Sequence, residues 1–144
     1  MSENLTSEEI DGVVEFNRTE IERYGGVFEI TEVDENYLYN TLPRMIDSHN
    51  HIQDRRTRIV KKATEIMSGI TYDQPFFDAN KRTALTATVL FLEKYGFTLP
   101  MHSFHFQLEI HELLNKVVVR PVGDPLIFSD VEQYIENVIF SLTS

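Results

Sequence analysis

The stretch ANKRTALTATVLFLEKY at residues 79–95 decides the fold. At helical spacing its apolar side chains surround almost the whole axis, and such a helix is buried among other elements. Gly96 follows directly, and glycine after the last turn is a common helix end. The stretch therefore predicts a central helix with the rest of the chain packed around it.

Other segments carry apolar residues at the spacing of one helix face. A capping box of Thr6 and Glu9 predicts a first helix, which Gly25 and Gly26 end. Further helices are expected from Asp34 onward with Pro43 as a kink or split, over residues 55–70, over residues 103–116, and behind a second capping box of Ser129 and Glu132. We expect a loop or a small hairpin at residues 47–54 and extended backbone at residues 117–119. The sequence thus predicts an all-α bundle with, at most, one short β-hairpin.

Length and composition restrict the class of protein. The chain has 144 residues, close to the size of one domain, so we expect a single domain over residues 1–144. It has no cysteine, which excludes disulfides, thiolate metal sites and cysteine nucleophiles. No apolar run approaches the roughly 20 residues of a membrane span, and acids stand where a signal peptide carries bases. We expect a cytoplasmic protein that binds no membrane.

The net charge of −10 is unevenly distributed along the chain. Residues 1–36 hold eleven acids and two bases, a surplus that either attracts a basic partner or aids solubility. Five bases lie between positions 55 and 62, as a solvated helix face or as a patch that faces an anion. Direct nucleic-acid binding is not expected, because it needs a clustered basic face on the whole domain.

Residues 74–82, Gln-Pro-Phe-Phe-Asp-Ala-Asn-Lys-Arg, lead into the central helix. The first turn of a helix has free N–H groups and a positive dipole end, which favour an anion. Arg82 can grip phosphate oxygens, and Asp78 is a hard oxygen ligand that suits Mg²⁺ shared with a phosphate. Small Ala79 lets a ligand approach the backbone, and Phe76 is expected to anchor the loop in the core. The plain alternative is a capped helix with Asp78 as the cap and two exposed bases.

This segment resembles the signature of the Fic/Doc family, His-Pro-Phe-x-Asp/Glu-Gly-Asn-Gly/Lys-Arg. The Doc branch is more similar still, since DANKRTAL at residues 78–85 matches its form. EFNRTEIERYGG at residues 15–26 resembles the first helix of that branch, and LFLEKYG at residues 90–96 resembles the end of its motif helix. The resemblance covers roughly residues 8–100 and implies a Fic/Doc-type helical bundle, with a short β-hairpin flap before the motif as an option.

The resemblance implies a transferase that moves part of a nucleotide to a hydroxyl of a target protein. Most Fic members move AMP, whereas the Doc branch moves the terminal phosphoryl group. The implied cofactors are ATP or another nucleotide and Mg²⁺. The implied partners are a protein with a Ser, Thr or Tyr hydroxyl and, for the toxin half of a toxin–antitoxin pair, an antitoxin protein.

The same resemblance assigns roles to individual positions. Asp78 holds the metal and has a catalytic role with Arg82, which also clamps phosphates. Ala79, Asn80 and Lys81 form the rest of the nucleotide cradle. Lys81 replaces the second motif glycine, and Leu85 stands where many Fic members have a second arginine. Both changes favour the Doc-like reaction.

The catalytic histidine position of the family holds Gln74. A glutamine amide has no pKa near neutrality, so it cannot remove the proton from the attacking hydroxyl. Three interpretations are open: an inactive Fic-fold module that binds a nucleotide, a phosphate or a protein; an engineered inactivation; or chemistry that tolerates the loss because positioning dominates phosphoryl transfer. Asp73 is a candidate substitute base, with a solvated turn acid as its alternative.

Two further features have weaker patterns. The five histidines show no recognised zinc spacing, and His49 or His51 is instead a candidate for a flap that holds the backbone of the target. Residues 31–36, TEVDEN, fit the family's loose inhibitory pattern, in which Glu35 reaches the motif arginine. The alternative for that segment is an ordinary helix cap.

Overall fold

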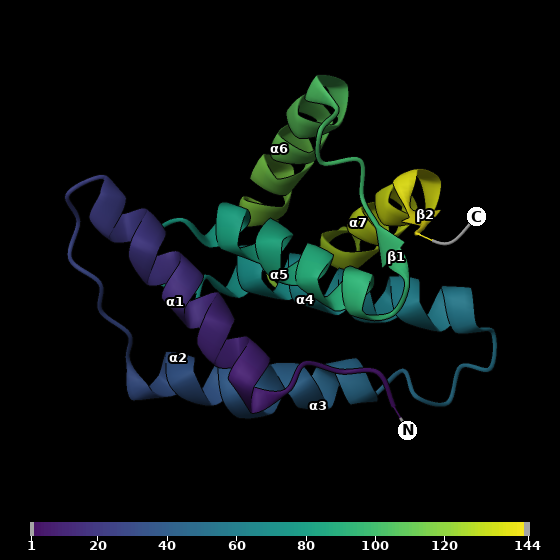
Figure 1. Cartoon of the computed structure of the whole chain (residues 1–144), viewed down its shortest axis with the longest axis horizontal. Coiled ribbons are helices and arrows are strands. Elements are labelled where there is room, and N and C mark those ends of the chain that lie inside the picture. Colours follow the sequence, from purple (N-terminus) through teal and green to yellow (C-terminus); the bar gives the residue numbers. More distant parts are fainter. Residues whose placement is uncertain (1, 143–144) are drawn as a thin grey trace.

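The chain folds as an assembly of α-helices with one minimal strand pair (Figure 1). The computed structural model describes residues 2–142. Its elements are α1 (Ser7–Arg23), α2 (Glu32–Asn36), the π-helical turn η1 (Tyr37–Thr41), α3 (Leu42–Asp47), α4 (Arg55–Asp73), α5 (Asn80–Lys94), β1 (Phe97–Thr98), α6 (Phe104–Val118), α7 (Leu126–Val138) and β2 (Phe140–Ser141). The predicted all-α class is confirmed. Among the described residues, no helix is long and apolar enough to cross a membrane.

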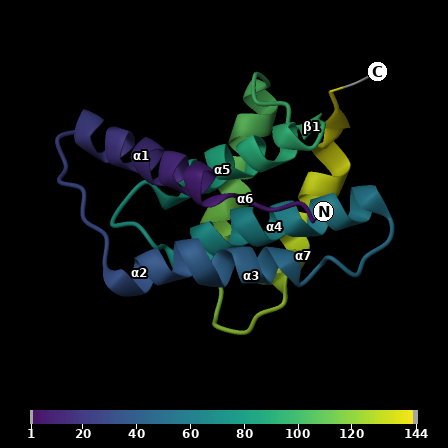
Figure 2. The same cartoon turned by 60° about the horizontal axis from the view of Figure 1, so that its bottom comes forward.

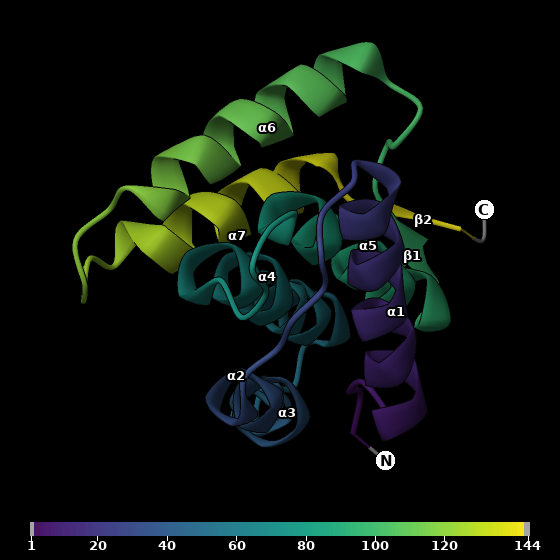
Figure 3. The same ribbon diagram turned by 90° about the vertical axis from the view of Figure 1, so that its left-hand side faces the viewer.

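Two adjacent helices form the centre of the molecule. α4 packs against α3, α5, α6 and α7, and α5 also packs against α1. Figure 3 shows α4 and α5 between the α2–α3 segment on one side and the α6–α7 pair on the other. Ala84, Phe91 and Leu92 of α5 are fully buried, as are Ile59 and Ile66 of α4. The predicted central helix is therefore confirmed, and it shares the centre with α4.

The N-terminal half matches the predicted helices apart from one cap. The capping box is present, since the Glu9 N–H donates to Thr6 Oγ1 at 3.1 Å and the Thr6 N–H donates to Glu9 Oε1 at 2.8 Å. Asp34 is not the cap of the second helix. Thr31 is, because its hydroxyl oxygen accepts from the Asp34 N–H at 3.1 Å.

Pro43 does not split the second predicted helix, because residues 32–47 stay helical without a break. Proline has no N–H to donate within a helix, and it is tolerated only in a first turn. Here it lies at the start of α3, and the wide turn η1 joins α3 to α2. The chain thus accommodates Pro43 with a π-helical insertion, a feature that often marks functional sites.

Two expectations for helix ends were wrong, whereas the loop alternative for residues 47–54 is confirmed. Asp47 ends α3, residues 48–54 form turns without a hairpin, and the one strand pair in residues 2–142 joins β1 to β2. Val117 and Val118 belong to α6 instead of being extended. α7 begins at Leu126, so Ser129 lies inside the helix; Pro125 fits a helix start, and Asp124 Oδ1 accepts from the Leu126 N–H at 2.9 Å.

The five bases between positions 55 and 62 make contacts within the chain instead of facing a ligand. Arg56 pairs with Glu136, Lys61 with Glu132, and Arg58 with Glu3, while Arg55 donates to the Tyr95 carbonyl. Lys62 is wholly buried and also pairs with Glu3, so the solvated-face interpretation fails there. Figure 2 shows the N-terminal segment that carries Glu3 crossing over α4. The predicted anion patch is therefore not free.

Candidate functional site

The loop between α4 and α5 is held between two residues in the left-handed backbone region. Gln74 ends α4 with φ 50°, and Ala79 precedes α5 with φ 60°. Residues other than glycine rarely adopt positive φ, and such strain is concentrated at functional sites. The direction of this loop is thus set at a cost in conformational free energy.

Three side chains fix the loop in place. Phe76 is buried in the core, which confirms its predicted anchoring role. Asn80 holds the backbone of Phe76 from both sides, because its Oδ1 accepts from the Phe76 N–H at 3.0 Å and its Nδ2 donates to the Phe76 carbonyl at 2.9 Å. Asn17 of α1 donates to the Asp78 carbonyl at 2.9 Å and to Thr83 Oγ1 at 3.0 Å. The Asn80 side chain is therefore committed to the loop, which leaves its backbone N–H for a ligand.

Sequence reasoning did not identify Asn17 as part of the site. It is fully buried and shares the inner face of α1 with Val13 and Ile21. A polar residue on an otherwise apolar helix face was the available signal, since buried amides are retained where they find partners.

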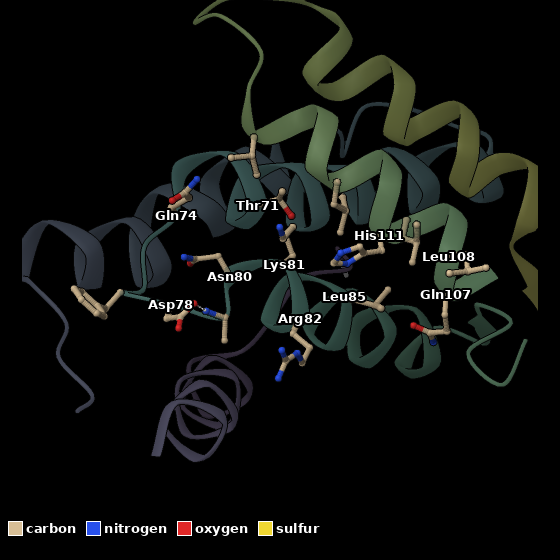
Figure 4. A pocket seen from close by; sticks show the side chains of 15 residues that line it. Thr71, Gln74, Asp78, Asn80, Lys81, Arg82, Leu85, Gln107, Leu108 and His111 are labelled. Carbon is tan, nitrogen blue, oxygen red and sulfur yellow. Dashed lines mark hydrogen bonds between the residues drawn. The ribbon is translucent and has the colours of Figure 1, made fainter. Parts of the chain in front are cut away.

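A cleft of about 830 Å³ opens beside the loop (Figure 4), a size typical of ligand sites. The motif residues to which the resemblance assigned roles all line it: Gln74, Asp78, Ala79, Asn80, Lys81 and Arg82. From α4, the loop and α5, the lining residues are Thr71, Gln74, Phe77, Asp78, Ala79, Asn80, Lys81, Arg82 and Leu85. From α6 they are Gln107, Leu108, Ile110, His111, Leu114 and Val118. The α6 wall was missed, because only tertiary packing brings it to the motif.

The start of α5 presents its free backbone groups to this cleft. In the part of the chain that the structure describes, no side chain caps α5. The first-turn N–H groups and the positive end of the helix dipole therefore favour an anion there. Asp78 does not act as the predicted plain cap, since its Oδ1 accepts only from the N–H of the next residue, Ala79, at 2.7 Å.

Arg82 leaves α5 on the side away from α6 (Figure 4). Its Nη1 lies 3.4 Å from Glu20 Oε1 on α1, and its guanidinium lies 5.7 Å from the centre of the Tyr24 ring. Glu20 is largely buried, whereas Arg82 is about half exposed. The acid beside the motif arginine is therefore Glu20. Glu35 lies on α2, where Thr31 provides the ordinary cap.

Asp73 faces a different part of the molecule. Burial raises the pKa of its carboxyl, and the Tyr37 hydroxyl donates a hydrogen bond to it. Burial and the charge of Asp73 in turn raise the pKa of Tyr37. A methyl group at Gly69 would collide with the Tyr37 hydroxyl, so a larger residue there would displace the Tyr37 side chain. Asp73 does not line the cleft, so the geometry does not support Asp73 as a substitute base.

The candidate flap histidines are not among the residues that line the cleft. Their loop, residues 48–54, precedes α4, whereas the motif follows that helix of 19 residues. His49 Nε2 lies 2.9 Å from Glu65 Oε1, and His51 Nδ1 lies 3.1 Å from the Ser48 carbonyl oxygen. These contacts explain both residues without a target backbone. Within residues 2–142, no three His, Asp or Glu side chains gather as a metal site.

Comparison with known families agrees with this geometry. The family model described as Fic/DOC family matches residues 6–92, which is 87 of the 144 residues. The chain belongs to the Fic/DOC family, and this membership indicates nucleotide-transferase chemistry in general terms. No curated protein and no solved structure matches the chain. α6, which forms the far wall of the cleft, lies beyond the matched residues.

Replacing Ala79 with glycine is expected to stabilise the protein by up to about 1 kcal/mol. The substitution removes the strain of a Cβ at φ 60°, which outweighs the added freedom of the unfolded chain. Ala87→Gly, in the right-handed interior of α5, is the control and is expected to lose at least about 1 kcal/mol. Urea unfolding measures both, and a loss at both positions contradicts the strain assignment.

Proposed function

We propose that this protein is a Doc-like, nucleotide-dependent protein transferase. It moves the terminal phosphoryl group of ATP, or AMP in the Fic manner, to a Ser, Thr or Tyr hydroxyl of a target protein. We further propose that it acts in the cytoplasm as the toxin half of a toxin–antitoxin pair. The observation that carries the proposal is the uncapped start of α5 facing a cleft that Asp78, Lys81 and Arg82 also line.

The chain's own groups divide the work of holding the nucleotide. The first-turn N–H groups of α5 bind phosphate oxygens, and Arg82 adds a bidentate cation once it leaves Glu20. Asp78 fits Mg²⁺, because it lines the cleft and this ion is commonly held by one carboxylate together with substrate phosphates. When bound, the ion supplies positive charge that neutralises the phosphates.

The choice between transfer of the terminal phosphoryl group and transfer of AMP depends on the residue at position 85 of α5. Leu85 lines the cleft and is largely buried, so it offers no charge to an extended triphosphate. A cradle with one fewer cation favours the Doc-like transfer of the terminal group over AMP transfer. Gln74 orients the attacking hydroxyl by hydrogen bonding and does not take its proton.

A second candidate function follows from Gln74 itself. Its side chain lines the cleft at the family's histidine position and has no basic nitrogen. A protein with this site can bind a nucleotide, a phosphate or a partner protein without transferring a group. Binding alone does not separate the two candidates, whereas transfer of label does.

The test combines a binding arm and a transfer arm. Arg82→Ala is expected to weaken binding of Mg²⁺-ATP by roughly 10- to 100-fold in calorimetry, the value of one charged hydrogen bond. Arg56→Ala is the matched control, since Arg56 is similarly exposed but pairs with Glu136 away from the cleft. Equal affinities for both variants contradict the phosphate site.

For the transfer arm, the protein and its Gln74→His variant are incubated with cell extract and ATP labelled at the α or the γ phosphate. Label on a protein from the γ position alone supports the Doc-like reaction, and label from the α position supports AMP transfer. Nucleotide binding without transfer by either protein supports the inactive module.

A further inference from the structure

We propose that the hydroxyl of Thr71 and the ammonium of Lys81 form a second phosphate contact, on the α6 side of the start of α5. The proposal rests on the proposed function, because it names further groups that hold the same nucleotide. The ligand class is the phosphate oxyanion of a nucleoside polyphosphate.

Thr71 is a buried hydroxyl without a partner. Its side chain is fully buried near the end of α4, and its Oγ1 makes no hydrogen bond within residues 2–142. Two other buried threonines behave differently. Thr64 Oγ1 donates to the Val60 carbonyl at 2.8 Å, and Thr88 Oγ1 donates to the Ala84 carbonyl at 2.7 Å. Because buried polar groups are nearly always paired, Thr71 is an exception that needs an explanation.

The unpaired hydroxyl belongs to the cleft. Thr71 is one of its lining residues, and Figure 4 shows the Thr71 oxygen directed toward Lys81 of α5. Lys81 reaches across to α6, where its Nζ donates to Asn115 Oδ1. No carboxylate pairs with Lys81 among the described residues. An ammonium carries three donors, so its capacity is not filled by Asn115.

These groups converge where the backbone already favours an anion. A free hydroxyl donor, an unneutralised ammonium and the uncapped first turn of α5 border the same cleft. Arg82 lies on the opposite side of α5 with Glu20. A phosphate group at the helix start therefore has a cation on each side, with Lys81 and Thr71 supplying the contacts on the α6 side.

The test compares threonine variants of nearly equal shape. Thr71→Val removes the hydroxyl, and Thr71→Ser keeps it. Thr64→Val is the matched control, because it removes a buried hydroxyl from the same helix outside the cleft. Calorimetry measures the Kd of each variant for Mg²⁺-ATP and for pyrophosphate, and thermal unfolding measures each variant without ligand.

We expect Thr71→Val to raise the Kd for both ligands about 10-fold, while Thr71→Ser and Thr64→Val bind as the unaltered chain does. Without ligand, Thr71→Val is expected to keep or raise the unfolding temperature, whereas Thr64→Val lowers it.

An unchanged Kd for Thr71→Val, with binding by the unaltered chain intact, overturns this assignment and leaves the proposed function standing. A lower unfolding temperature with an unchanged Kd identifies a hydroxyl that serves the fold alone, and likewise overturns it. Failure of the unaltered chain to bind either ligand overturns both proposals.

Discussion

Gln74→His is expected to raise the rate of group transfer by about 10²- to 10⁴-fold, the usual contribution of a general base. Gln74 lines the cleft at the end of α4, and the described residues leave its side chain without a hydrogen bond. An imidazole there finds no competing partner and can accept the proton of an attacking hydroxyl. The measurement is the initial rate of label transfer from ATP to a target protein.

Gln107→His is the control for this gain. Gln107 also lines the cleft, but it lies on α6 and its Nε2 donates to the Met101 carbonyl at 2.8 Å. A histidine at this distant wall is expected to leave the rate unchanged. If the rate of label transfer rises equally in both variants, any imidazole in the cleft suffices and the position of Gln74 is not special. If neither gains while ATP still binds, the missing base does not limit the reaction.

Lys62→Ala is expected to destabilise the fold by about 3–5 kcal/mol, the cost of removing one partner from a buried ion pair. Lys62 is completely buried, and its Nζ donates to the Glu3 carbonyl at 2.8 Å, to Glu3 Oε1 at 3.2 Å and to Asn50 Oδ1. Its loss leaves the Glu3 carbonyl and Asn50 Oδ1 without this donor and opens a cavity beside α4, while Arg58 still pairs with the Glu3 carboxylate. Such a loss is a large share of the roughly 5–15 kcal/mol that holds a domain folded.

The neighbouring Lys61→Ala is the matched control in urea unfolding. Lys61 pairs with Glu132 at 3.0 Å, but both side chains are about one-third exposed, so a change of at most about 1 kcal/mol is expected. If the two variants lose similar amounts of stability, the large contribution assigned to the buried Lys62–Glu3 ion pair is contradicted.

The pairing of Glu3 with Lys62 and Arg58 also predicts that the stability of the fold depends on pH. Hydrogen bonds from Arg58 and Lys62 lower the pKa of Glu3 from 4.5 to about 2. The Glu3 carboxylate therefore contributes fully to the free energy of unfolding above its ordinary pKa, and this contribution disappears as the pH falls from about 5 toward 2.

The motif and the helices beside it were predictable because their signals are local. The capping box of Thr6 and Glu9, the helix ending at Gly96 and the buried Phe76 follow from neighbouring residues. The capping pattern at Ser129 misled, because Pro125 gave an earlier and better helix start.

Tertiary contacts were beyond the reach of the sequence. Nothing near Arg82 indicates that Glu20, 62 residues earlier, lies against it. The same holds for Lys62, whose burial depends on the path of the N-terminal segment, and for α6, which packs against the motif from later in the chain. The charge pattern along α4 therefore predicted a solvated position for Lys62, which is buried, although Arg55 and Arg56 are exposed as that pattern implies.

The cleft has walls of different origin, and this bears on the design of inhibitors. One wall is the motif loop and the start of α5, inside the residues that match the family; the other is α6, outside them. A compound that occupies only the phosphate end would compete with nucleotide in many family members at once. A compound that also fills the space beside Leu108, Ile110 and Leu114 would gain selectivity for this chain from contacts that the shared signature does not encode.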